Sequence, residues 1–145
     1  SVPRHLALSP DGATLYVSCL GDHRLAVLDT ASERVTRYVP VGRGPKAVDV
    51  FPDGAHVVTA DYGGSSVTLV DTRDWSTRTL DIPSMDHASG VVAAREGLRF
   101  FVTGWYDNHL YAVGVEGAGA HVVTSERLRV RVLAGRAWHD AHPVE

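Results

Sequence analysis

The sequence lacks several features that define large classes of protein. It has a single cysteine, Cys19, so no disulfide can form within the chain. No apolar run approaches the roughly 18 residues that a membrane helix needs, and the sequence shows no signal peptide. With 14 basic and 17 acidic residues and a net charge of −3, it also lacks the basic excess typical of nucleic-acid binding. We therefore expect a soluble protein that engages neither a membrane nor nucleic acid.

The sequence does contain an internal repeat. The segment 6–30, LALSPDGATLYVSCLGDHRLAVLDT, returns at 48–72 as VDVFPDGAHVVTADYGGSSVTLVDT. The Pro-Asp-Gly turn and the closing Asp-Thr pair are both displaced by 42 residues. A period of this length indicates a repeat architecture, in which each unit buries its apolar surface against its neighbours.

Each unit contains four short segments with the pattern of β-strands. A Pro-Asp-Gly turn separates the first two, because proline presets φ and glycine supplies a positive φ. Segments rich in β-branched and aliphatic residues, such as 14–18 and 25–28, are typical of half-buried strands. Four strands in about 40 to 45 residues is the blade spacing of a β-propeller. The prediction is an all-β chain whose blades each have four antiparallel strands.

Three blades account for most of the chain. Within one propeller region spanning 1–145, we expect blade 1 at 2–43, blade 2 at 44–86, a degenerate blade 3 at 87–126, and an extra strand and tail at 127–145 that could belong to a further blade. Closed propellers typically have four to eight blades. About three to three and a half blades therefore make a partial or half propeller, whose apolar flanks would be exposed.

The missing blades have two expected sources. Two copies would supply about 290 residues, close to seven periods of 42, so a homo-oligomer could close a seven-bladed ring. The remainder of a longer chain could close it equally well. Both alternatives stay open at the level of the sequence.

Several phrases resemble a known repeat. The segments 42–48, 9–12, 15–18 and 27–30 are similar to the repeat of the YVTN family of β-propellers, and 3–7 is similar to a phrase of the related seven-bladed lactonase-like propellers. The resemblance covers 2–83 strongly and 84–125 weakly, and it implies the propeller fold. Such propellers are binding scaffolds, enzymes or cofactor holders, so it implies no single function. Family members are often exported, which leaves an exported location open.

The loops that lead into the first strand of each blade carry the candidate binding groups. In a propeller these strands line the central channel, and these loops lie on the face that usually binds ligands. At comparable positions the three units offer Arg4 and His5, Arg43 and Lys46, and Asp86 and His87. Polar loop residues that are simply solvated are the alternative interpretation.

A second set of loops, between the second and third strands, reaches the same face. One of them contains Trp105, Tyr106 and His109, and rings exposed there favour a flat or aromatic partner. Aromatic residues that cap a blade edge are the alternative. The candidate ligand-binding residues are therefore Arg4, His5, Lys46, His87, Trp105, Tyr106 and His109.

Three functions are compatible with these residues. The preferred one is a scaffold that binds a small-molecule or protein ligand through the channel face. The second is a lactonase-like, hydrolytic or isomerising enzyme at the channel mouth, which would need groups among Arg4, His5, His87 and Asp49 to converge on one carbonyl. The third is a metal- or cofactor-holding propeller, with His87, His139 and His142 as weak candidates whose spacing matches no defined ligand framework. No catalytic residue and no cofactor is assigned.

Overall fold

The computed structural model describes residues 1–116 and 119–127, with side chains described for 1–116. It consists of three antiparallel sheets of four strands, each with its strands in chain order. Sheet 1 comprises β1 (Pro3–Leu8), β2 (Thr14–Cys19), β3 (Arg24–Asp29) and β4 (Arg34–Pro40). Sheet 2 comprises β5 (Pro45–Val50), β6 (His56–Asp61), β7 (Ser66–Asp71) and β8 (Thr77–Asp81). Sheet 3 comprises β9 (Ala88–Ala93), β10 (Arg99–Gly104), β11 (His109–Glu116) and β12 (Gly119–Arg127).

This architecture confirms the all-β prediction with four-stranded antiparallel blades. Two single-turn 3-10 helices, η1 (Leu20–Asp22) and η2 (Tyr62–Gly64), join the second and third strands of sheets 1 and 2. The extra strand and tail expected after Arg127 lie outside the described residues.

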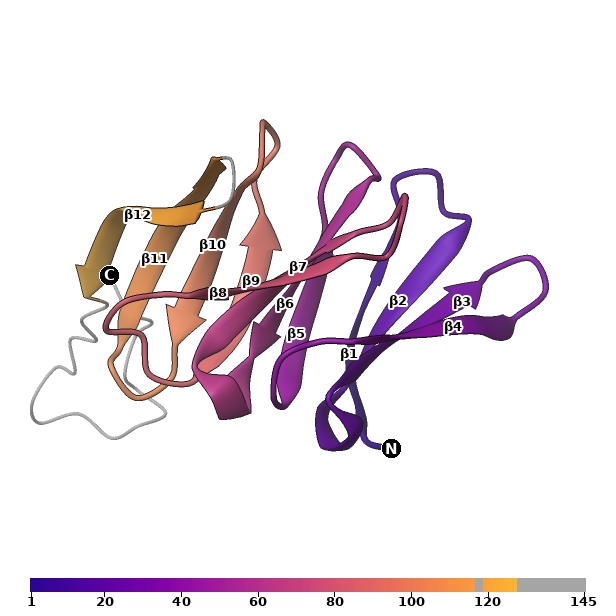
Figure 1. Cartoon of the computed structure of the whole chain (residues 1–145), viewed down its shortest axis with the longest axis horizontal. Coiled ribbons are helices and arrows are strands. Elements are labelled where there is room, and N and C mark those ends of the chain that lie inside the picture. Colours follow the sequence, from indigo (N-terminus) through magenta and orange to yellow (C-terminus); the bar gives the residue numbers. More distant parts are fainter. Residues whose placement is uncertain (117–118, 128–145) are drawn as a thin grey trace, which may run out of the picture.

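The sheets lie side by side, with sheet 2 in the middle (Figure 1). Their first strands are neighbours, since β5 packs against β1 on one side and against β9 on the other. Each sheet therefore meets the next one face to face, beginning at its first strand. This places the loops that precede β1, β5 and β9 at one end of the molecule and the Pro-Asp-Gly turns at the other.

Sheet 2 is buried on both faces because its strands carry apolar side chains in consecutive positions. On β6, Val57 points into the core between sheets 1 and 2, and Val58 points into the core between sheets 2 and 3. Both side chains are fully buried. A strand covered on two sides needs apolar side chains on both faces, and Val57 and Val58 provide them on β6.

No other sheet in the described part of the chain covers the outer faces of sheets 1 and 3. Leu6 and Leu8 alternate with residues of the core along β1, and they are 60% and 55% exposed. On sheet 3, Val92 and Phe101 are paired across β9 and β10 on the outer face, 59% and 39% exposed. These are the apolar flanks expected of a partial propeller, and exposed apolar surface of this kind favours association.

We expect the 145-residue chain to self-associate through these flanks. Light scattering on a size-exclusion column should give a mass above 15.6 kDa, and the double substitution Leu8→Glu with Phe101→Glu should return it to 15.6 kDa. The exposed turn substitution Ala31→Glu adds charge elsewhere and should leave the mass unchanged. A wild-type chain that stays at 15.6 kDa at all concentrations would contradict this expectation.

A buried carboxylate ties sheet 2 to the loop that precedes it. Asp61 is fully buried and accepts hydrogen bonds from the hydroxyls of Thr59 (2.7 Å) and Thr68 (2.6 Å). The amide of Gly42 in turn donates to the Thr68 hydroxyl at 2.9 Å. A Cβ on Gly42 would lie 2.2 Å from Asp61 Oδ2, so only glycine allows the loop to approach this closely.

Burial raises the pKa of Asp61 to about 6, although the hydroxyl hydrogen bonds act in the opposite direction. The folded state therefore holds this proton more tightly than the unfolded chain does. The resulting stability is present below the unfolded pKa near 3.8 and is lost as the pH rises through about 6.

Replacing Asp61 by Asn should remove this pH dependence. Between pH 4 and pH 7 the free energy of unfolding of the variant should rise by about 3 kcal/mol relative to wild type, because two pKa units correspond to roughly that energy. Urea denaturation followed by circular dichroism measures it. Asp81→Asn, at an exposed position of β8, is the matched control. Parallel pH profiles for wild type and the Asp61 variant would refute the assignment.

Candidate functional site

A β-bulge places one extra residue near the start of the first strand in each sheet. Pro3 pairs with Cys19 and His5 with Ser18, which leaves Arg4 unpaired. The same shift leaves Lys46 extra on β5 and Ser89 extra on β9. A bulge bends the strand and re-aims a side chain. The cations at equivalent positions of blades 1 and 2 are thus bulge residues at the channel end of the sheets.

The loops between the second and third strands turn sharply toward the same end. The residue before the third strand is in the left-handed region in all three sheets, with φ of 54° at His23, 52° at Ser65 and 57° at Asn108. These turns bring Tyr62 of η2 and the loop between β10 and β11 close to β5 and β9. Ser65 also accepts a hydrogen bond from the amide of His87 at 3.1 Å, which joins sheets 2 and 3.

Lys46 lies among aromatic rings. Its ammonium nitrogen is 3.7 Å from the ring centroid of Trp105 and 4.6 Å from that of Tyr62. The two rings are edge to face, with centroids 6.4 Å apart. Cation–π contacts of this kind are attractive, and they hold the ammonium group of Lys46 in place. Burial lowers the pKa of Lys46, and the nearby charge of Arg4 lowers it further.

His87 extends this group of rings. Its ring centroid lies 4.7 Å from that of Tyr62 and 4.9 Å from that of Tyr106, both edge to face. The hydroxyls of Tyr62 and Tyr106 are 3.4 Å apart. We call Lys46, Tyr62, His87, Trp105 and Tyr106 the aromatic cluster. It draws on sheets 2 and 3 and is located where β5 and β9 begin.

The aromatic cluster also contains a paired histidine and carboxylate. His87 Nδ1 lies 2.5 Å from Asp86 Oδ1, and His87 itself has a left-handed φ of 57°. A carboxylate on one ring nitrogen fixes the tautomer and leaves the other nitrogen available as a base or a hydrogen-bonding group. Backbone strain of this kind persists only where the surroundings hold it in place.

Asp107 holds the loop that carries Trp105 and Tyr106. Its carboxylate accepts hydrogen bonds from the Asp86 amide (2.9 Å), the His109 amide (2.9 Å) and the Tyr111 hydroxyl (2.6 Å). Burial acts to raise the pKa of Asp107, but these hydrogen bonds outweigh it and leave the pKa lowered. The carboxylate thus stays ionised and fastens the loop to the segment before β9.

The structure brings together four of the seven residues predicted from the sequence: Lys46, His87, Trp105 and Tyr106. Arg4 is near enough to influence the charge of Lys46. The ring of His5 instead lies against the Val48 carbonyl of β5, with Nδ1 at 3.2 Å. His109, the first residue of β11, is hydrogen-bonded to the Asp107 carbonyl and lies beside Tyr111 of the same strand. His5 and His109 therefore have structural contacts, and their role in binding stays a prediction.

Tyr62 is the member of the cluster that the sequence analysis missed. Its position in the repeat is equivalent to that of Trp105 in unit 3 and of Leu20 in unit 1. Two aromatic residues at one position of the repeat were the available signal. Among the weak metal candidates, His139 and His142 lie outside the described residues, and His87 belongs to the aromatic cluster.

Within residues 1–116 and 119–127, no three His, Cys, Asp or Glu side chains are grouped as metal ligands. No helix within these same residues is long and apolar enough to span a membrane.

Three four-stranded sheets packed through neighbouring first strands define a β-propeller-type fold. Two solved structures share it. The chain matches hydrazine synthase of Kuenenia stuttgartiensis with a TM-score of 0.77 and 27% identity, covering 85% of this chain and 35% of that one. It matches a chain of the mitotic checkpoint complex with a TM-score of 0.77 and 17% identity, covering 91% of this chain and 41% of that one. The second likeness concerns the fold alone.

Two curated proteins are similar in sequence. Antigen Lp49 of Leptospira interrogans is 34% identical over 41% of this chain and 16% of the antigen. The beta subunit of hydrazine synthase of Kuenenia stuttgartiensis is 32% identical over 48% of this chain and 24% of the subunit. The aligned region thus spans about a sixth to a quarter of these relatives. No protein-family model matches the chain, so membership of the YVTN family stays a prediction.

Asp107→Ala should loosen the loop without unfolding the sheets. The amide of Trp105, which donates to the Asp86 and His87 carbonyls at 2.9 Å, should exchange with solvent deuterium at least about tenfold faster. The amide of Val58, in the core, should be unchanged. Tyr111→Phe removes one of the three hydrogen bonds to Asp107 and should give a smaller effect. Equal exchange at Trp105 in wild type and the Asp107 variant would show that the carboxylate does not hold the loop.

Proposed function

We propose that this chain is part of a β-propeller scaffold that binds a ligand through the aromatic cluster, and that the ligand presents a flat aromatic group beside an anionic one. The observation that supports this most directly is the position of Lys46, whose ammonium lies over Trp105 and beside Tyr62. The charge is oriented before any ligand arrives, which lowers the entropic cost of binding.

The charge of the site favours an anion. Arg4 and Lys46 are like charges at equivalent bulges, and the charge of Arg4 contributes to the lowered pKa of Lys46. An anionic group placed between them would relieve this repulsion. Asp86, the acidic neighbour, is already engaged by His87 at 2.5 Å.

The apolar surface of the site favours a flat group. Trp105 and Tyr106 are 54% and 59% exposed, although both belong to residue types enriched at binding hot spots. Asp107 restrains the loop that presents them, so little side-chain freedom remains to be lost on binding. A planar ligand could cover both rings and leave its charge beside Lys46.

The ligand could belong to a small molecule or to a protein chain. Protein partners are supported by one relative, which is named as a subunit of hydrazine synthase. The open apolar faces of sheets 1 and 3 support further blades on either side. We infer that these blades, from a second copy or from a longer chain, complete the ring around the site.

An enzymatic alternative rests on one observation, the contact of His87 with Asp86. A histidine oriented in this way can act as a general base. Of the residues considered for a lactonase-like site, His5 contacts Val48, and Asp49 accepts hydrogen bonds from the amides of Ala93 (2.7 Å) and Val50 (2.9 Å). Both thus have structural partners, and this makes binding the better supported function.

Binding of indole-3-acetate tests the proposal, because this probe combines a flat ring with a carboxylate. We expect it to shift the amide resonances of Trp105 and Lys46 in NMR titrations, and to bind at least about tenfold more tightly than the neutral indole-3-acetamide. Trp105→Ala should weaken both ligands by removing the ring contact. Lys46→Gln should weaken only the acid and so abolish the preference.

Arg95→Gln is the matched control for charge, because Arg95 is exposed in the turn between β9 and β10 at the opposite end of sheet 3. It should leave the preference for the acid unchanged. If acid and amide bind equally to wild type, or if Arg95→Gln has the same effect as Lys46→Gln, the aromatic cluster is not the binding site.

A further inference from the structure

A cavity lies at the opposite end of the blades from the aromatic cluster. It has a volume of about 510 Å³ and opens between sheets 1 and 2. Its walls include the Pro-Asp-Gly turns of both blades, together with Asp29, Tyr16 and Trp75. The proposed ligand site uses none of these residues.

Tyr16 presents its hydroxyl, without a protein partner, in the wall of this cavity. The residue is only 3% exposed, and its hydroxyl has no hydrogen-bond partner among the described residues. Burial raises the pKa of Tyr16, and the charge of Asp11 raises it further, which is consistent with a phenol that faces this carboxylate. The hydroxyl oxygen is not among the fully buried unpartnered atoms, so it faces the cavity, where water or a ligand can hydrogen-bond to it.

Two carboxylates in the same wall also lack a counter-charge. The Ser9 hydroxyl (2.6 Å) and the Ala13 amide (3.0 Å) bind Asp11 through Oδ1 and lower its pKa. Hydrogen bonds from Ser32 likewise lower the pKa of Asp29. Both groups are therefore ionised at neutral pH, and no ion pair in the described part of the chain neutralises either.

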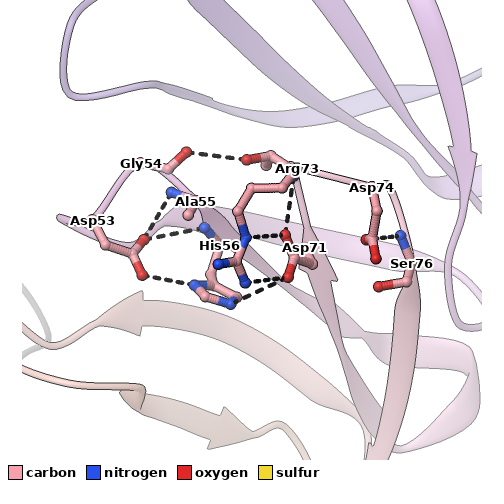
Figure 2. Close-up of polar contacts among 9 residues, drawn as sticks. Asp53, Gly54, Ala55, His56, Asp71, Arg73, Asp74 and Ser76 are labelled. Carbon is pink, nitrogen blue, oxygen red and sulfur yellow. Dashed lines mark hydrogen bonds and ion pairs between the residues drawn. The ribbon is translucent and has the colours of Figure 1, made fainter.

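Blade 2 provides an internal comparison. Asp53 and Asp71 stand at the positions equivalent to Asp11 and Asp29, and each has a basic side chain as its partner (Figure 2). His56 Nδ1 lies 2.6 Å from Asp53, and Arg73 binds Asp71 through two side-chain nitrogens. The equivalent residues of blade 1 are Thr14 and Ala31, which carry no charge. Blade 1 thus keeps the acidic pair of the repeat without the cations that neutralise it.

We propose that the cavity between sheets 1 and 2 binds a guanidinium or primary ammonium group, with Asp11 and Asp29 as its anionic partners and Tyr16 as a hydrogen-bond acceptor. The group belongs to an arginine or lysine side chain of a partner, or to a free organic cation. A guanidinium has five N–H donors and can reach two carboxylates and a phenol at once. The site is independent of the aromatic cluster.

Trp75 offers an apolar wall for the carbon chain that carries this charge. The guanidinium of Arg37 already lies 5.0 Å from the centroid of the Trp75 ring, so the ring accepts a cation in this geometry. Arg37 and His56 are basic side chains near the cavity. An incoming cation therefore needs both Asp11 and Asp29 to outweigh them.

The test is a titration with butylguanidinium and with the neutral isostere butylurea, followed by NMR of the Tyr16 ring protons. We expect butylguanidinium to bind at least about tenfold more tightly than butylurea. Tyr16→Phe keeps the ring and removes the hydroxyl, and should weaken the cation several-fold. Ala31→Arg supplies the partner that Arg73 gives to Asp71, and should abolish the preference for the cation.

Asp81→Asn, an exposed change of equal charge on β8, is the control and should leave binding unchanged. An N-acetylated Gly-Arg-Gly amide distinguishes the two sources. Tighter binding than butylguanidinium indicates a peptide partner, and equal binding indicates a free cation. Equal affinity for butylguanidinium and butylurea, or full binding by Ala31→Arg with its fold intact by circular dichroism, would overturn the proposal.

Discussion

Face-to-face burial of four-stranded sheets is the constraint on which the rest of this structure depends. A sheet with apolar side chains on both faces needs a neighbour on each side, and only sheet 2 has both. Val57 and Val58, adjacent on β6, anchor two separate cores for this reason. The open outer faces of sheets 1 and 3 follow from the same rule, since each of these sheets has one neighbour within the described chain.

Because the faces of the sheets are used for packing, the candidate binding groups lie at the ends of the sheets. At the channel end, bulges and short turns gather Lys46, Tyr62, His87 and the loop held by Asp107. At the other end, the turns of adjacent blades enclose the cavity beside Tyr16. Both sites lie at junctions between blades, where groups from two sheets meet. The repeat thus creates the opportunity for a site, and departures from the repeat provide its chemistry.

The sequence predicted the strands well because their pattern is local: a turn every few residues and an apolar run between turns. It also predicted the end of the molecule where Lys46, His87, Trp105 and Tyr106 meet, since loops at equivalent positions of a repeat share one end. It could not predict that the ring of His5 contacts Val48, or that the hydroxyl of Tyr16 faces a cavity between two sheets. Those properties depend on how one sheet packs on the next, which the spacing of residues does not encode.

The bulges at Arg4, Lys46 and Ser89 have a consequence for how such a protein can evolve. A residue in a regular strand has a fixed partner opposite it, so a substitution there must still pack against that partner. A bulge residue has no partner opposite it, so a substitution there does not have to fit such a pair. The three positions already hold an arginine, a lysine and a serine on one backbone geometry. Each blade therefore carries a position at the channel where chemistry can diversify while the architecture stays the same.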